Sequence, residues 1–69
     1  MEELKLRDEF IKLGQAMKAA GIVSSGIDAK MLIQDGQVIV NGEVETRRGK
    51  KLYDGDVFEF EGEVFKVVK

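Results

Sequence analysis

The sequence predicts an α+β fold in which two short helices pack on a small, mainly antiparallel sheet. Three observations carry this prediction: apolar residues at helical spacing near the N-terminus, a capped second helix that ends at Gly36, and alternating apolar residues around Asn41-Gly42 and after Val57. A chain of 69 residues can close one small hydrophobic core. We therefore expect a single domain over residues 1–69.

The N-terminal part predicts a short strand and then a helix. Leu4 and Leu6 alternate with charged neighbours, which is a strand pattern. A helical spacing of apolar residues follows, and Gly21 is expected to end it; the apolar positions are Phe10, Leu13, Met17 and Ala20. The opposite face of this helix would carry Lys12, Gln15 and Lys18.

A second helix is predicted from about Gly26 to Asp35. Ser25 and Asp28 have the spacing of a capping box, and Gly36 supplies the stop. The buried stripe would be Ala29, Leu32 and Ile33, with Lys30 and Gln34 on a flank that can face solvent or a ligand.

Ile27 and Met31 lie away from that stripe, beside Lys30. Two interpretations are open, because small domains expose few apolar pairs without a cause. The N-terminal strand could cover the pair, which is the interpretation we favour, or the pair could contact a partner protein.

The C-terminal half predicts hairpins. Val38 and Val40 alternate into Asn41-Gly42, a strong signal for a type I′ turn, and Val44 begins the returning strand. Residues 57–60 alternate again, Glu61-Gly62 can turn, and residues 64–68 are predicted as an edge strand tipped with lysine. Asp54-Gly55-Asp56 is interpreted as a turn between strands rather than a cation site.

Charge is unevenly distributed along the chain. The net charge is −2, but residues 12–51 carry seven basic and four acidic side chains, and both ends are acidic. The densest run is Arg47-Arg48-Gly49-Lys50-Lys51, which is typical of phosphate contact. The same run could be a solvated loop balanced by neighbouring carboxylates; the helical cations Lys12, Lys18 and Lys30 favour a binding surface.

The residue types present argue against catalysis. The chain has no cysteine and no histidine, which removes thiol and imidazole nucleophiles and bases and the usual zinc ligands. No phosphate-binding glycine motif occurs, so we expect neither an enzyme nor a bound metal or cofactor. The lack of cysteine and of an apolar signal segment favours a reducing, cytoplasmic location, with no membrane contact.

The five aromatic residues are predicted to be mostly core residues, because they fall at alternating or helical spacings. None lies in a sequence of the RNP type that stacks successive bases. A surface rich in lysine and arginine, with few side chains that could recognise bases, is suited to binding the phosphates and the shape of folded RNA. Charge alone does not distinguish RNA from DNA.

Residues 25–42, which read SGIDAKMLIQDGQVIVNG, resemble the signature of the S-four RNA-binding domain, named after a small-subunit ribosomal protein. The resemblance extends upstream through residues 10–21 and downstream through residues 45–52 to Gly55-Asp56. The whole chain resembles the small stand-alone bacterial proteins of this type, which are linked to ribosomal RNA and ribosome assembly.

The resemblance implies a non-catalytic protein that binds structured RNA through its two helices and the adjoining hairpin region. The residues that inherit the contact role are Lys12, Gln15, Lys18, Lys30, Arg47, Arg48, Lys50 and Lys51. Ser25, Gly36, Asn41 and Gly42 match by position as cap, stop and turn. Gly26 departs from the arginine that many members carry after the capping serine. The alternative function is a protein-interaction module that uses Ile27 and Met31, with the basic loop steering an acidic partner.

Overall fold

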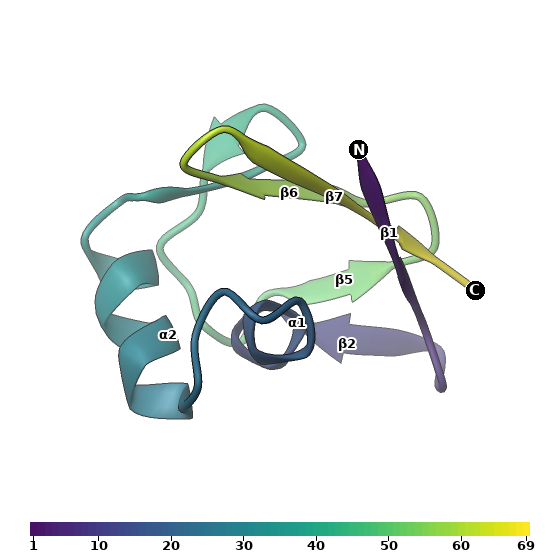
Figure 1. Ribbon diagram of the computed structural model, residues 1–69, viewed down its shortest axis with the longest axis horizontal. Coiled ribbons are helices and arrows are strands. Elements are labelled where there is room, and N and C mark those ends of the chain that lie inside the picture. The colour runs from purple at the N-terminus through teal and green to yellow at the C-terminus, as the bar shows by residue number, and fades with distance from the viewer.

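The computed structural model describes residues 1–69 and has the predicted α+β architecture, with two helices and seven strands (Figure 1). The elements in chain order are β1 (Glu2–Lys5), β2 (Phe10–Lys12), α1 (Leu13–Ala19), α2 (Gly26–Gln34), β3 (Val38–Val40), β4 (Glu43–Val44), β5 (Lys51–Tyr53), β6 (Val57–Phe60) and β7 (Glu63–Val68). Neither helix is long and apolar enough to cross a membrane.

The strands form two sheets. A five-stranded sheet has the order β1-β7-β6-β3-β4, in which every pairing is antiparallel except that of β1 with β7. A separate antiparallel ribbon joins β2 to β5. Figure 1 shows both helices on one side of the larger sheet, with the β2–β5 ribbon beside α1.

One helix prediction and one strand prediction need correction. Residues 10–12 form β2 and not the first turn of a helix, because they pair with residues 51–53, a strand that the sequence analysis did not predict. The helix therefore begins at Leu13. The C-terminal strand is not an edge strand, because β1 lies beside β7 in parallel and takes the edge position.

The second helix is confirmed, together with the Ser25 half of the predicted capping box. The Ser25 side chain accepts a hydrogen bond from the Asp28 backbone N–H at 3.2 Å, which satisfies one free donor of the first helical turn. Ala29 and Ile33 are fully buried on its inner face, and Leu32 packs partly buried against them. The cap and the apolar stripe together fix where α2 begins and which face it buries.

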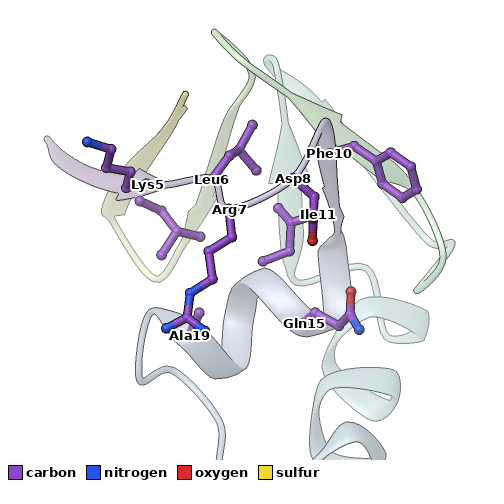
Figure 2. A pocket seen from close by; sticks show the side chains of 9 residues that line it. Lys5, Leu6, Arg7, Asp8, Phe10, Ile11, Gln15 and Ala19 are labelled. Carbon is purple, nitrogen blue, oxygen red and sulfur yellow. The ribbon is translucent and has the colours of Figure 1, made fainter.

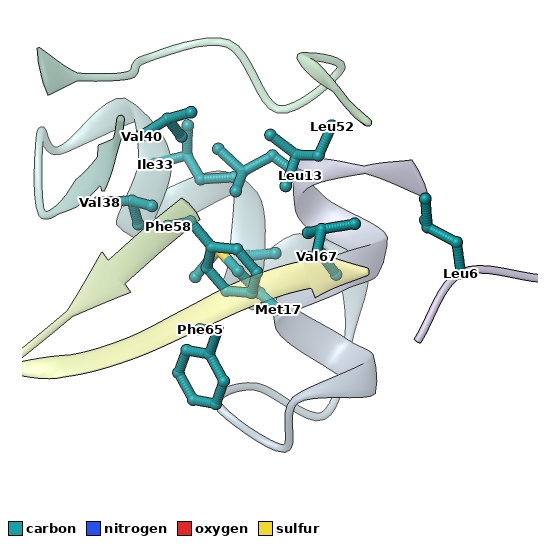
Figure 3. Close-up of a cluster of buried hydrophobic side chains, with 12 residues drawn as sticks. Leu6, Leu13, Met17, Ile33, Val38, Val40, Leu52, Phe58, Phe65 and Val67 are labelled. Carbon is teal, nitrogen blue, oxygen red and sulfur yellow. The ribbon is translucent and has the colours of Figure 1, made fainter. Parts of the chain in front are cut away.

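One hydrophobic core joins the sheet to the helices (Figure 3). Phe58 and Phe65 pair directly across β6 and β7, and their rings stack with centroids 5.1 Å apart. Twelve residues form the cluster: Leu6, Leu13, Ala16, Met17, Ala29, Ile33, Val38, Val40, Leu52, Phe58, Phe65 and Val67. Leu13 of α1 and Leu52 of the β2–β5 ribbon are both fully buried in this core, and their burial fixes where α1 and the ribbon lie.

The Asn41-Gly42 hairpin is confirmed, since both residues have positive φ, at 49° and 84°. The Asn41 side chain also reaches across to the turn after β5. Its Nδ2 donates to Asp56 Oδ1 at 3.1 Å, and its Oδ1 accepts from the Val57 backbone N–H at 2.9 Å. Residues 54–56 form the predicted turn, so this network ties the hairpin to that turn.

Replacing Asn41 with alanine is expected to destabilise the protein by about 2 kcal/mol. The substitution removes two exposed side-chain hydrogen bonds, worth about 0.5 kcal/mol each, and places a residue that disfavours positive φ in the turn, which costs about 1 kcal/mol. For a domain of this size the melting temperature should fall by about 8–16 °C, measured by circular dichroism. A melting temperature within a degree or two of the wild type would show that the Asn41 network carries no stability.

Candidate nucleic-acid interface

The beginning of α1 is joined to the basic loop by two backbone hydrogen bonds. The Leu13 N–H donates to the Lys50 carbonyl at 2.8 Å, and the Gly14 N–H donates to the Arg48 carbonyl at 3.1 Å. These bonds bring cations together that lie far apart in the sequence. Because the two backbone segments are hydrogen-bonded to each other, side chains from the basic loop and from the start of α1 lie on one surface.

A hollow of about 290 Å³ lies at this junction, and we call it the basic hollow. Its lining contains no apolar and no acidic residue: Lys12, Gly14, Gln15, Gly26, Arg48 and Gly49. The three side chains that can donate, Lys12, Gln15 and Arg48, are all exposed. Two cations and an amide, with no carboxylate in the lining, form a surface suited to a phosphate group.

Gly14 belongs to this site, although it was not among the predicted contact residues. The residue is buried in the first turn of α1, and a Cβ atom there would lie 2.8 Å from Arg48 Cγ. Any other residue would displace the Arg48 side chain. Glycine inside a helix costs about 1 kcal/mol relative to alanine. A glycine in a short predicted helix therefore indicates that another part of the chain packs closely against it, and this signal could have identified Gly14.

Arg47, the neighbour of Arg48, lies in a different environment. Its Nε and Nη2 donate to the two carboxylate oxygens of Glu45 at 3.0 and 3.2 Å, and its backbone N–H donates to the same carboxylate at 3.0 Å. The hydrogen bond from Arg47 holds the pKa of Glu45 below its ordinary value of 4.5, so Glu45 remains charged until the solution is clearly acidic. The Arg47 charge is therefore partly neutralised within the loop.

The other predicted contact residues are distributed around the basic hollow. Lys50 is half-buried and lines a neighbouring hollow together with Arg47, Glu43 and Glu45. Lys51 lies directly opposite Lys12 in the β2–β5 ribbon. Lys18 and Lys30 are exposed on α1 and α2 but do not line the basic hollow. The structure thus joins Lys12, Gln15 and Arg48, and leaves the contact role of the full set a prediction.

A second hollow, of about 440 Å³, also includes Gln15 in its lining (Figure 2). It is bounded by the segment between β1 and β2 and by α1, and Gln15 lines both hollows. Its rim carries Lys5, Arg7 and Asp8, so one carboxylate accompanies two cations there. This mixed charge makes it a weaker candidate for an anion than the basic hollow.

The expectation that the N-terminal strand covers Ile27 and Met31 is wrong. Their side chains are 71% and 65% exposed, because β1 pairs with β7 at the edge of the sheet and not with α2. Met31 also borders a shallow depression lined by Ile22, Val23 and Leu32. The pair is therefore an accessible apolar spot on α2.

Comparison with known proteins identifies the family. The profile described as S4 domain matches residues 4–68 of the chain. The chain belongs to the S-four family. This S-four protein is 46% identical over 59 residues to a probable ribosome maturation protein, RlbA of Bacillus subtilis, covering 86% of this chain and 83% of the relative.

A second relative, YbcJ of Escherichia coli, is named as a candidate RNA-binding protein and is 40% identical over 58 residues, covering 84% of the S-four chain and 83% of YbcJ. The solution structure of YbcJ, described as revealing an αL motif involved in RNA binding, superimposes with a TM-score of 0.75 at 36% identity. The superposition covers 100% of this chain and 89% of that one. The predicted fold and family resemblance are thereby confirmed.

Proposed function

We propose that this S-four protein binds structured RNA through the basic hollow and the cations around it, and that it has no catalytic activity. The observation that carries the proposal is the convergence of Lys12, Gln15 and Arg48, from two separate segments, on one hollow without a carboxylate. Such a surface attracts phosphates, and the names of the relatives support RNA as their source. The surrounding residues proposed to add contacts are Lys18, Lys30, Arg47, Lys50 and Lys51.

The proposed RNA is ribosomal RNA, with a role in ribosome maturation and hence a cytoplasmic location. This finer proposal is supported by the relative RlbA, whose name refers to ribosome maturation. The absence of cysteine and histidine and of any cluster of three or more potential metal ligands favours a role in binding rather than chemistry.

Binding of the purified protein to structured ribosomal RNA fragments across a salt series tests the proposal, with duplex DNA of equal length as the control. Affinity should be higher for RNA and should fall as salt rises, because phosphate contacts release counterions. Equal affinity for RNA and for duplex DNA would show that the protein binds any polyanion and does not prefer RNA. Failure to bind any RNA at low salt would contradict the proposed function.

Within the basic loop, Arg48→Ala should weaken RNA binding more than Arg47→Ala does. Arg48 is free at the rim of the basic hollow, whereas Arg47 already donates to both oxygens of Glu45. We expect a loss of about tenfold for Arg48→Ala, the value of one charge-assisted hydrogen bond, and a smaller loss for Arg47→Ala. Fluorescence anisotropy with a labelled RNA measures both. The reverse order would show that Arg47 leaves Glu45 to contact RNA.

A protein contact at Ile27 and Met31 is a second candidate function, favoured by their high exposure. Replacing both residues with serine should leave the fold and the RNA affinity of the purified domain within about twofold of wild type, because such surface changes cost little. Loss of activity in cells together with intact RNA binding in the purified variant would support a protein partner. Loss of RNA affinity would instead place the apolar spot inside the RNA surface.

A further inference from the structure

We propose that the outer face of the β2–β5 ribbon is a stacking site for one unpaired nucleobase, with Tyr53 as the ring on which the base stacks. This inference rests on the proposed RNA-binding function and names a feature of the RNA that the protein would recognise. The favoured target is a duplex that carries an unpaired nucleotide next to its paired part.

The strand register creates the outer face. Successive side chains of a strand point to opposite faces, and in this ribbon Leu52 is fully buried with Ile11 packed against the core. The remaining residues of the ribbon therefore lie on the other side, in two directly opposite pairs, Phe10 with Tyr53 and Lys12 with Lys51. Figure 2 shows the Phe10 ring turned away from Leu6 and Ile11.

In the aromatic pair, the Tyr53 ring is accessible and the Phe10 ring supports it. The ring centroids of Phe10 and Tyr53 are 5.8 Å apart, with the planes inclined by 50°. Phe10 is half-buried, whereas Tyr53 is 45% exposed and is the one aromatic residue among the exposed large apolar side chains. The Tyr53 backbone N–H donates to Asp56 Oδ2 at 2.7 Å, which fixes the strand end that carries the ring. Packing on Phe10 already restricts the Tyr53 ring, so the ring loses less freedom when a base stacks on it.

The lysine pair supplies the charge that a nucleotide requires. Like charges directly opposite in an antiparallel pair are unfavourable, and Lys12 and Lys51 occupy such positions without an intervening carboxylate on the ribbon. Lys51 Nζ lies 4.8 Å from the centre of the Phe10 ring, beside the aromatic pair. A phosphate bound beside this lysine pair would offset the repulsion and bring its own base near Tyr53.

The ribbon is continuous with the basic hollow, since Lys12 belongs to both. A duplex whose phosphates lie at the basic hollow would therefore place an unpaired nucleotide leaving that duplex over the ribbon. Base stacking on an aromatic ring tolerates any base, so this site would recognise an unpaired position rather than a particular sequence.

The test compares one RNA hairpin in two forms, with a blunt end and with a short unpaired tail, for wild type, Tyr53→Ala, Tyr53→Leu and Tyr53→Phe. The tail should raise the affinity of the wild type about tenfold, near the lower end of what stacking of one base contributes. Tyr53→Phe should keep this advantage, because it keeps the ring. Tyr53→Ala and Tyr53→Leu should lose it, while their binding to the blunt hairpin stays unchanged.

The protein supplies its own optical reporter, because Tyr53 is its single tyrosine and it has no tryptophan. Stacking should quench the tyrosine emission when the tailed hairpin binds and not when the blunt hairpin binds at the same nucleotide concentration. The leucine variant retains apolar packing on Phe10, so it remains informative if the alanine variant folds poorly.

Three results would overturn the inference. A tail advantage that persists in Tyr53→Leu, or an equal loss of affinity for both hairpins, would show that Tyr53 does not receive the unpaired base; blunt-hairpin binding by the wild type would still support the proposed function. Failure of the wild type to bind either hairpin would contradict the proposed function and the stacking site together.

Discussion

The double variant Lys12→Ala/Arg48→Ala is expected to lose about a hundredfold in affinity for structured RNA. Both residues line the basic hollow and both are exposed, so the change would remove the two charge-assisted phosphate contacts that we propose there, without opening the core. At the low end of its range such a contact is worth about 1.5 kcal/mol, so two are worth about 3 kcal/mol, and 1.4 kcal/mol corresponds to tenfold in affinity. The slope of log affinity against log salt should become shallower by about 2.

The matched control for this variant is Lys66→Ala/Lys69→Ala. It changes the net charge by the same amount, but Lys66 lies on β7 and Lys69 follows that strand, outside the basic hollow. RNA binding should remain within about threefold of wild type, since these charges act only at long range through salt-screened solution. Equal losses in the two double variants would contradict a localised RNA surface and indicate general attraction to a polyanion.

The largest effect on stability is expected for Phe58→Ala. Phe58 is fully buried at the centre of the core and stacks on Phe65 with ring centroids 5.1 Å apart. Truncation of a buried phenylalanine costs about 3–5 kcal/mol, and a chain of this length has a total stability of roughly 3–10 kcal/mol. The variant should therefore be partly or wholly unfolded at room temperature, as measured by urea unfolding followed by circular dichroism.

Val44→Ala is the control for the stability experiment, because Val44 is an apolar strand residue that is 60% exposed. Its unfolding free energy should change by no more than about 0.5 kcal/mol. A Phe58→Ala variant with a wild-type urea midpoint would contradict the central position assigned to this ring.

Features encoded by neighbouring residues could be predicted from the sequence. The Asn41-Gly42 turn requires two residues with positive φ, and this pair provides them without help from the rest of the fold. Ser25 and Asp28 likewise make their capping contact within one turn of helix. Local chemistry fixed the ends of α2 and the position of the hairpin.

Features that depend on distant pairing could not be predicted in the same way. The spacing of Phe10 and Leu13 suits a helix, but the partner strand of residues 51–53 makes residues 10–12 a strand. Only this pairing places Phe10 and Tyr53 side by side on an outer face. The exposure of Ile27 similarly follows from the pairing of β1 with β7, which no local pattern reveals.

In the candidate site, too, residue types could be predicted from the sequence, but their arrangement in space could not. Lys12 and Arg48 were identifiable from charge, whereas Gln15 was predicted from its place on the polar face of the first helix and from the family resemblance. Their joint position at one hollow depends on the hydrogen bonds from Leu13 and Gly14 to the loop. The attachment of Arg47 to Glu45 depends on loop geometry, and net charge alone could not distinguish Arg47 from Arg48.

The most direct test of the RNA surface is a map of backbone amide NMR shifts as structured ribosomal RNA is added to the intact protein. Glycines serve as well-spread reporters, with Gly14, Gly26 and Gly49 at the basic hollow and Gly62 in the turn between β6 and β7. We expect the first three and their neighbours to shift, and Gly62 to remain unchanged. Shifts concentrated near Gly62, with the basic hollow unaffected, would contradict the assignment of the RNA interface.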